Sequence, residues 1–78
     1  MVEAFIFIVA EPNKIDKVGT EVRKIENVRE AYAVTGEFDI VIKVEAKDFS
    51  ELSKVVKDKL LGIPGVVKTT TSVVIERY

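Results

Sequence analysis

The sequence contains no cysteine and no histidine among its 78 residues. Without cysteine there are no disulfides and no thiolate metal sites. Without histidine, the commonest transition-metal ligand and the usual acid–base group of enzymes are missing. We therefore expect a domain that is not an enzyme and that holds no metal or cofactor.

Long hydrophobic runs and a strong net charge are also missing. The longest apolar run, Ala4 to Ala10, is far shorter than the roughly 20 residues that span a bilayer, and no basic segment precedes it as in a signal peptide. The formal net charge is -1, with acidic and basic residues interspersed, which argues against direct binding to nucleic acid. The sequence thus predicts a soluble, cytoplasmic domain. Its many Lys and Glu residues, with no Gln, are typical of a thermophilic source.

Apolar residues fill both faces of the first predicted strand, residues 2–10. Strand alternation divides them into one set of Ala4, Ile6 and Ile8 and a second set of Phe5, Phe7 and Val9. A strand that is apolar on both faces is typical of the interior of a sheet that is covered on both sides.

Two helices are predicted by apolar residues at helical spacing. The first has Asn13 as its expected N-cap and presents one apolar face, formed by Ile15, Val18, Val22 and Ile25. The second opens at Asp48, where Glu51 completes an acidic capping box. Its apolar stripe is Phe49, Leu52, Val56 and Leu60. Gly62 is expected at the C′ position, and Pro64 prevents the helix from continuing.

Two further strands flank a tight turn in the middle of the chain. Residues 28–35 form the first of them and residues 38–44 the second, with Phe38 on the same apolar face as Ile40, Ile42 and Val44. Gly36 supplies the turn, because glycine reaches positive φ without steric cost. A last strand is expected from Val66 to about Arg77.

The predicted order of elements is βαββαβ in a single domain, residues 1–78. Two right-handed crossovers joined by a hairpin give an α+β, ferredoxin-like sandwich. Its antiparallel strand order is 4-1-3-2, and both helices lie on one face of the sheet. The other face then carries one of the two apolar sets of the first strand. Because an uncovered apolar face marks an interface, we expect two subunits to pack sheet against sheet, as in dimeric α/β-barrel proteins.

The first candidate for a ligand site combines the glycine turn with the hydroxyl residues of the last strand. Backbone amides at Gly36 can hold a carboxylate, and Asp39 can hold an ammonium group. Hydroxyls can serve either end of such a ligand, and the last strand offers Thr69, Thr70, Thr71 and Ser72. Together these groups would recognise a zwitterionic amino acid. The structural alternative is that Asp39 stabilises its own turn and the threonines are ordinary strand residues.

Two other candidate sites are better explained by ordinary structure. Glu37 and Asp39 have no third ligand nearby that would hold a cation. The aromatic residues Phe5, Phe7 and Tyr32 lack the flanking basic residues of RNA-stacking motifs. We expect the carboxylates to be solvated and the aromatic rings to pack in the core or in an interface.

The ordered set of motifs resembles the ligand-binding (RAM) domain of the Lrp/AsnC transcription regulators. The resemblance covers essentially the whole chain. It rests on the apolar first strand, the V-x-G-x-(F/Y)-D turn at residues 34–39, the segment LLGIPGV at 60–66 and the segment TTTSVV at 69–74. Full-length members carry an N-terminal helix-turn-helix domain, whereas this chain begins at the first strand. The resemblance therefore implies a stand-alone domain with no DNA-binding domain and no direct contact with nucleic acid.

By this resemblance, the chain is expected to be a regulatory module that senses an amino-acid effector between subunits. The family forms sheet-packed dimers and larger rings, commonly octamers built as a tetramer of dimers. A full-length Lrp/AsnC-type regulator is a further expected partner. The family's ligand positions map onto Thr35, Gly36, Phe38 and Asp39 in the turn and onto Thr69, Thr70 and Thr71 in the last strand.

Three alternatives remain open. An ACT-type amino-acid sensor has a similar topology but would bind its ligand near residues 11–13, where the expected glycine is missing. A ligand-free assembly module needs no site at all. A small dimeric α/β-barrel enzyme would need polar residues on the strands.

Overall fold

The computed structural model describes residues 1–78 as one antiparallel sheet with helices packed on it. The elements are β1 (Val2–Ala10), η1 (Pro12–Lys14), α1 (Ile15–Arg23), β2 (Val28–Ala33), β3 (Ile40–Ala46), α2 (Phe49–Lys54), η2 (Val55–Leu60) and β4 (Val66–Val73). The strand order β2-β3-β1-β4 is the predicted 4-1-3-2 order read from the other edge. The α+β, ferredoxin-like fold is thus confirmed.

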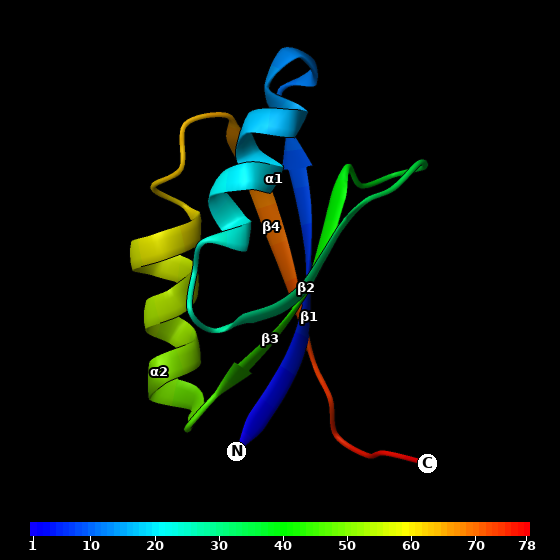
Figure 1. The fold of residues 1–78 in the computed structure, drawn as a ribbon. Helices are drawn as coiled ribbons and strands as arrows, with labels where there is room; N and C mark the ends of the chain where they lie inside the picture. The colour runs from blue at the N-terminus through cyan, green and yellow to red at the C-terminus, as the bar shows by residue number, and fades with distance from the viewer.

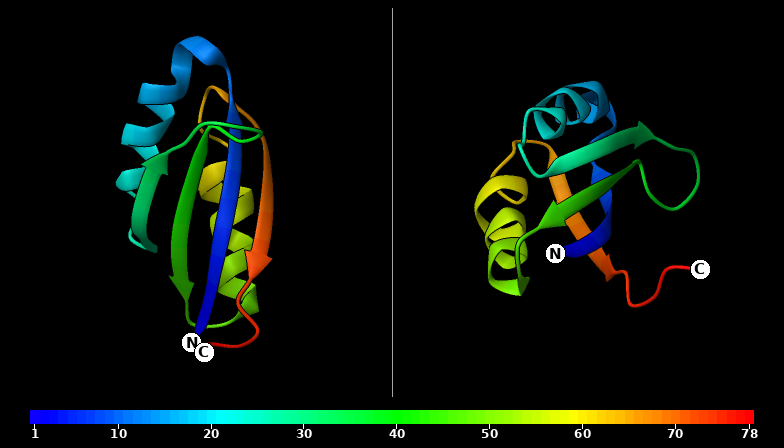
Figure 2. Two further views of the ribbon diagram at one scale, coloured as in Figure 1. Left: turned by 90° about the vertical axis from the view of Figure 1, so that its right-hand side faces the viewer. Right: turned by 60° about the horizontal axis from the view of Figure 1, so that its bottom comes forward.

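Both helices cover the same face of the sheet. Figure 1 shows α1 and α2 on one side of the strands, and Figure 2 (left) shows the opposite face toward the viewer with α2 behind it. Neither helix is long and apolar enough to cross a membrane. We call the face without helices the open face.

The helices bury one of the two apolar sets of β1. Ala4, Ile6 and Ile8 pair with Val44, Ile42 and Ile40 of β3, and all six side chains are buried at the helix side of the sheet. Val18 and Val22 of α1 complete this layer together with Leu52, Val55 and Leu60. No polar or charged side chain is buried, so the layer between the helices and the sheet is held by apolar contact.

The second apolar set of β1 lies on the open face. Phe5 is 40% exposed, and Phe7 and Val9 are half-buried. Their neighbours on β4 are polar, namely Ser72, Thr70 and Lys68. The open face is therefore apolar along its centre and polar toward the β4 edge.

The N-terminus of α1 differs from the prediction. Pro12 begins the short 3-10 turn η1, in which the Lys14 amide donates to the Glu11 carbonyl at 2.8 Å. Asn13 lies inside this turn, and α1 begins at Ile15 with no side-chain cap. The predicted N-cap at Asn13 is therefore wrong. Proline, whose fixed φ already suits a first helical position, starts the turn before Asn13 can cap it.

The N-terminus of α2 is capped as predicted. The Asp48 side chain accepts a hydrogen bond from the Glu51 amide at 2.8 Å. Glu51 in turn accepts from the Lys47 amide at 2.7 Å, one residue earlier than in a standard capping box. The helix then widens into the π-helical segment η2. Its wider spacing is seen where the Leu61 amide donates to the carbonyl of Val56, five residues earlier, at 3.0 Å.

The turn after η2 uses a different glycine from the one predicted. Gly65, not Gly62, has positive φ, at 102°. A Cβ on Gly65 would lie 2.9 Å from Lys14 Cβ and 3.0 Å from Val18 Cγ2. Gly65 therefore serves both the backbone turn and the close approach of this turn to α1.

Three strand ends also differ from the prediction. β2 ends at Ala33 and β3 begins at Ile40, so residues 34–39 form a longer loop than expected. β4 ends at Val73 rather than near Arg77, because Val73 already lies opposite Ala4 near the start of β1. The Val74 amide still donates to the Glu3 carbonyl, but Glu3 is the second residue of β1, so the strand offers almost no further pairing partners. Residues 74–78 form a tail that leaves the sheet (Figure 1).

Candidate functional site

The predicted site is centred on the loop at residues 34–39, which projects from the sheet beyond the two strands that it joins (Figure 1). Gly36 has φ of 107° and is exposed, and a Cβ added there would meet nothing within 4 Å. The prediction of positive φ at Gly36 is confirmed. Glycine is needed here for the backbone conformation and not for lack of space.

Asp39 makes two hydrogen bonds that fix this loop to the end of β1 and a third that closes the loop itself. Its Oδ2 accepts from the Ala10 amide at 2.9 Å, its own amide donates to the Ile8 carbonyl at 2.9 Å, and its carbonyl accepts from the Val34 amide at 2.9 Å. The side chain thus holds a neighbouring strand as well as its own turn. Oδ1 makes no hydrogen bond within the chain and stays available to a ligand.

Phe38 lies on the open face and not with the buried residues of β3. Its ring is tilted by 43° against the ring of Phe7, with 5.2 Å between the centroids. The predicted strand alternation with Ile40 is therefore wrong at this position. Regular pairing begins only at Ile40, and the bonds of Asp39 to β1 set the direction of the chain just before it.

The threonines of β4 lie across β1 from Asp39. Thr69, Thr70 and Thr71 pair with Ile8, Phe7 and Ile6, so Thr70 is on the open face and the other two are on the helix side. Because β1 lies between β3 and β4, Asp39 and the threonines are about two strand spacings, roughly 10 Å, apart. Thr35, at the tip of the loop, is exposed. One chain therefore does not bring the two halves of the predicted site into contact.

Two hydrogen-bonded contacts on the sheet surface shift the pKa values of Glu3 and Tyr32. No group of three or more Asp or Glu residues is placed to hold a metal ion. The Arg77 guanidinium donates to Glu3 and holds the pKa of that carboxyl below its usual range. The Tyr32 hydroxyl donates to Glu30 at 2.7 Å, which raises the pKa of Tyr32. Both groups lie outside the predicted ligand site, which offers one carboxylate, loop amides and hydroxyls.

The family model described as the Lrp/AsnC ligand binding domain matches residues 3–78. This chain belongs to that family. The leucine-responsive regulatory protein of Escherichia coli K12 is 37% identical over 65 residues, which are 83% of this chain and 40% of the relative. The HTH-type transcriptional regulator FL11 of Pyrococcus abyssi is 35% identical over 96% of this chain and 49% of its own length. The chain thus spans half or less of the curated regulators that it matches.

Solved structures show the same Lrp/AsnC ligand-binding fold. A protein from Thermus thermophilus superposes with a TM-score of 0.96 at 35% identity, covering 100% of this chain and 98% of that one. Escherichia coli AsnC superposes with a TM-score of 0.93 at 27% identity, covering 97% of this chain and 52% of that one. A transcriptional regulator from Neisseria meningitidis was solved as a complex with L-Met. It superposes with a TM-score of 0.88 at 28% identity, covering 96% of this chain and 50% of that one. The relatives with a stated role are regulators, as the predicted resemblance implied.

Proposed function

We propose that this domain binds an amino acid between subunits and thereby changes its own assembly or its contact with a partner regulator. The observation that carries the proposal is a carboxylate with one free oxygen beside an exposed glycine loop, in a member of a ligand-binding domain family. The Neisseria meningitidis relative that was solved with L-Met supports an amino acid as the class of ligand.

Distance argues for a site shared between subunits. The ammonium and carboxylate groups of an amino acid lie within one residue length, about 3.5 Å, of each other. Asp39 and the threonines of the same chain are roughly 10 Å apart across β1. In the proposal, Asp39 Oδ1 accepts from the ammonium group, amides around Gly36 hold the carboxylate, and Thr35 and Phe38 line the site. The hydroxyls come from β4 of another subunit, either Thr70 on its open face or Thr69 and Thr71 on its helix side.

The open face supports the proposed dimer. No helix covers this face (Figure 2), and its apolar centre lies along Phe5, Phe7 and Val9, where only the Phe38 ring packs against Phe7. The loop and the C-terminal tail both project past this face (Figure 1), so they would flank a second sheet packed against it. Larger rings of dimers, such as an octamer, and a full-length Lrp/AsnC-type regulator that shares the sheet interface are extensions of this proposal. An effector changes such assemblies only if it binds the two states with different affinity.

Calorimetric titration of the domain with each of the twenty amino acids tests the site. Asp39→Asn keeps an oxygen to accept from Ala10 but removes the charge that holds the ammonium group, so we expect about tenfold or greater loss of affinity. Glu37→Gln is the matched control, because it removes a carboxylate from the same exposed loop. Equal affinity of Asp39→Asn and the unmodified domain would contradict the site.

A ligand-free assembly module is the second candidate. It is favoured by the three hydrogen bonds that already occupy Asp39. In that case no amino acid would bind, while the oligomer would still form.

A further inference from the structure

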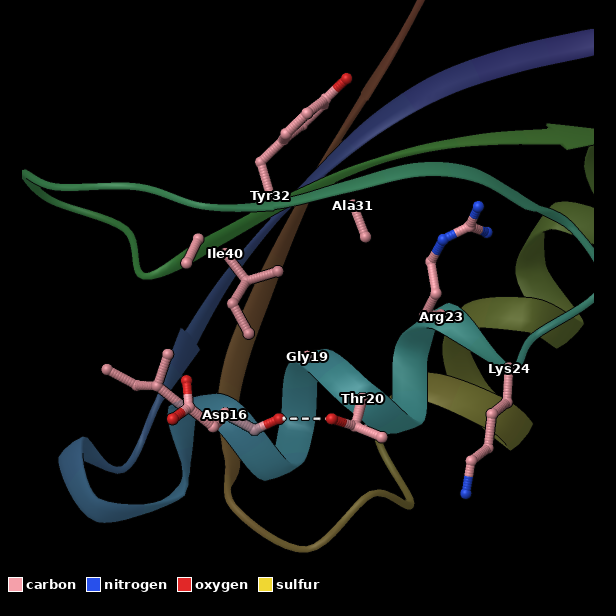
Figure 3. A pocket seen from close by; sticks show the side chains of 10 residues that line it. Asp16, Gly19, Thr20, Arg23, Lys24, Ala31, Tyr32 and Ile40 are labelled. Atoms are coloured by element: carbon pink, nitrogen blue, oxygen red, sulfur yellow. Dashed lines mark hydrogen bonds between the residues drawn. The ribbon is translucent and has the colours of Figure 1, made fainter.

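A groove of about 580 Å³ lies between α1 and β2, away from the loop at residues 34–39. Figure 3 shows it from close by. Small side chains form its floor: a Cβ on Gly19 would lie 3.9 Å from Ile40 Cδ1, and Ala31 and Ala33 face the groove from β2. Tyr32 points to the other side of the strand. Larger residues at Gly19 or Ala31 would fill this space, so the groove exists because these residues are small.

One wall of the groove is an unpaired strand edge. β2 is the outermost strand on its side of the sheet. The bond from the Val34 amide to the Asp39 carbonyl sets the alternation of the β2–β3 ladder. By that alternation, the backbone amides and carbonyls of Ala31 and Ala33 point outward from the edge. In Figure 2 (left), α1 extends past this edge, so a strand added to β2 would run in front of the helix.

The two ends of the groove carry opposite charges. Asp16 lies near the start of α1 and Arg23 at its end, seven residues apart, which is about 10 Å along a helix axis. Lys24 is paired with Glu21 at 3.0 Å, whereas Arg23 has no acidic partner in the chain. The Arg23 end lies nearest the start of β2, because a short turn joins the two elements.

We propose that this groove binds an extended peptide segment of a partner protein, which adds to β2 as an antiparallel strand. The outward amides and carbonyls of Ala31 and Ala33 would pair with the peptide backbone, and an apolar peptide side chain would fill the space above Gly19. The charges set the direction: a basic peptide residue lies at Asp16 and an acidic one, nearer the peptide C-terminus, at Arg23.

Two other occupants fit this groove less well. A free amino acid is too short to reach both charged ends, since its two charges lie about 3.5 Å apart. The β2 strand of a second copy would turn only alanines, Ala31 and Ala33, toward the groove and would leave its volume unfilled. An extended peptide with a large apolar residue between its charges matches both the distance between the charged ends of the groove and the volume of the groove.

The test uses a blocked synthetic peptide, Thr-Lys-Thr-Val-Thr-Glu-Thr, and a control with Lys and Glu exchanged. Alternation places Lys, Val and Glu on one face of the peptide. Backbone amide NMR signals of the isotope-labelled domain report where each peptide binds. We expect saturable shifts at Gly19, Ala31 and Ala33 with the first peptide, and binding of the control to be about fivefold or more weaker.

Three variants sharpen this experiment. Ala33→Pro removes an outward amide, which an edge strand tolerates, and should abolish binding. Lys68→Ala, on the opposite edge strand, is the control and should bind normally. The double variant Asp16→Arg with Arg23→Asp exchanges two exposed charges and should prefer the control peptide.

Four results would overturn the proposal: no saturable shift, shifts confined to the open face or β4, an unchanged preference in the double variant, or slow hydrogen exchange at Ala31 and Ala33 before peptide is added. The last result would mean that a second copy already covers the edge. Asp39→Asn should leave peptide binding unchanged, so failure here and failure of the amino-acid site are distinguishable.

Discussion

Two glycines of this domain adopt positive φ, but they differ in what surrounds them. Gly36 faces open space, whereas a Cβ on Gly65 would lie 2.9 Å from Lys14 Cβ. Alanine at either position costs about 1–3 kcal/mol in backbone strain, and at Gly65 overpacking adds about 1–3 kcal/mol. We therefore expect Gly65→Ala to lower the free energy of unfolding clearly more than Gly36→Ala, as measured in urea. Equal losses would show that α1 can move away from the turn.

Asp39 has both a structural role and a role in the proposed ligand site. One carboxylate oxygen holds the end of β1 through Ala10, and the other is free. Such a residue places a ligand charge where the loop is already fixed to the sheet, so binding there need not order the loop. Because this carboxylate also holds β1, a variant of Asp39 can alter the fold as well as the ligand site. The folding of each variant is therefore checked before its ligand affinity is interpreted.

At the scale of elements, the side-chain cap of α2 contributes to stability. The Asp48 carboxylate accepts from the Glu51 amide at 2.8 Å, and replacing such a cap by alanine typically costs about 1 kcal/mol. We expect Asp48→Ala to lower the free energy of unfolding by about this amount. Asp58→Ala removes an exposed acid from η2 that caps nothing and should change stability much less. Equal effects of the two variants would contradict the capping role.

The C-terminal tail is tied to the sheet by a charged contact between Arg77 and Glu3. Arg77 lowers the pKa of Glu3 from its ordinary value of 4.5. Because the folded pKa is below the unfolded one, the contact stabilises the tail fully above pH 4.5 and is lost as the pH falls through the lowered pKa. We expect NMR relaxation to show a mobile tail in acid, and in Glu3→Gln at neutral pH. Glu76→Gln, the control, should keep the tail ordered; a tail equally ordered in Glu3→Gln would contradict this role.

The order of the elements was predictable from the sequence because each signal was local. Period-two and helical patterns located β1, α1 and α2, and the βαββαβ order then left one strand arrangement. The errors arose where a distant contact decides the local structure. Asp39 bonds to Ala10, which lies 29 positions away, and turns Phe38 to the open face. Gly65 adopts positive φ where the turn presses against α1, and no pattern near Gly62 reveals that contact.

The local geometry of the candidate site was predictable to a similar extent. The glycine turn and its acid were found because Gly and Asp at that spacing are a local signal. The separation of Asp39 from Thr69 by β1 was missed, because it follows from the strand order and not from either segment alone. The groove was also missed. Its small residues Gly19, Ala31 and Ala33 lie on different elements, and only the packing of α1 beside β2 makes them neighbours.

At the scale of the whole molecule, the proposed dimer depends on the open face. Phe7 lies at its centre against Phe38 and is half-buried in the single chain. In a sheet-packed dimer, Phe7→Lys would bury an unpaired charge, so we expect sedimentation velocity to show monomers. Phe49→Lys changes a 65% exposed phenylalanine at the start of α2 and should leave the dimer intact. A dimer that survives Phe7→Lys in a folded domain would exclude this face as the interface.

Native mass spectrometry with and without each amino acid tests the central claim most directly. It reports the number of subunits and the number of bound ligands in the same spectrum. We expect an even-numbered oligomer that gains one amino-acid mass per subunit, and loses that gain in Asp39→Asn but not in Glu37→Gln. An oligomer that binds none of the twenty amino acids would contradict the sensing role and leave an assembly module as the function of the domain.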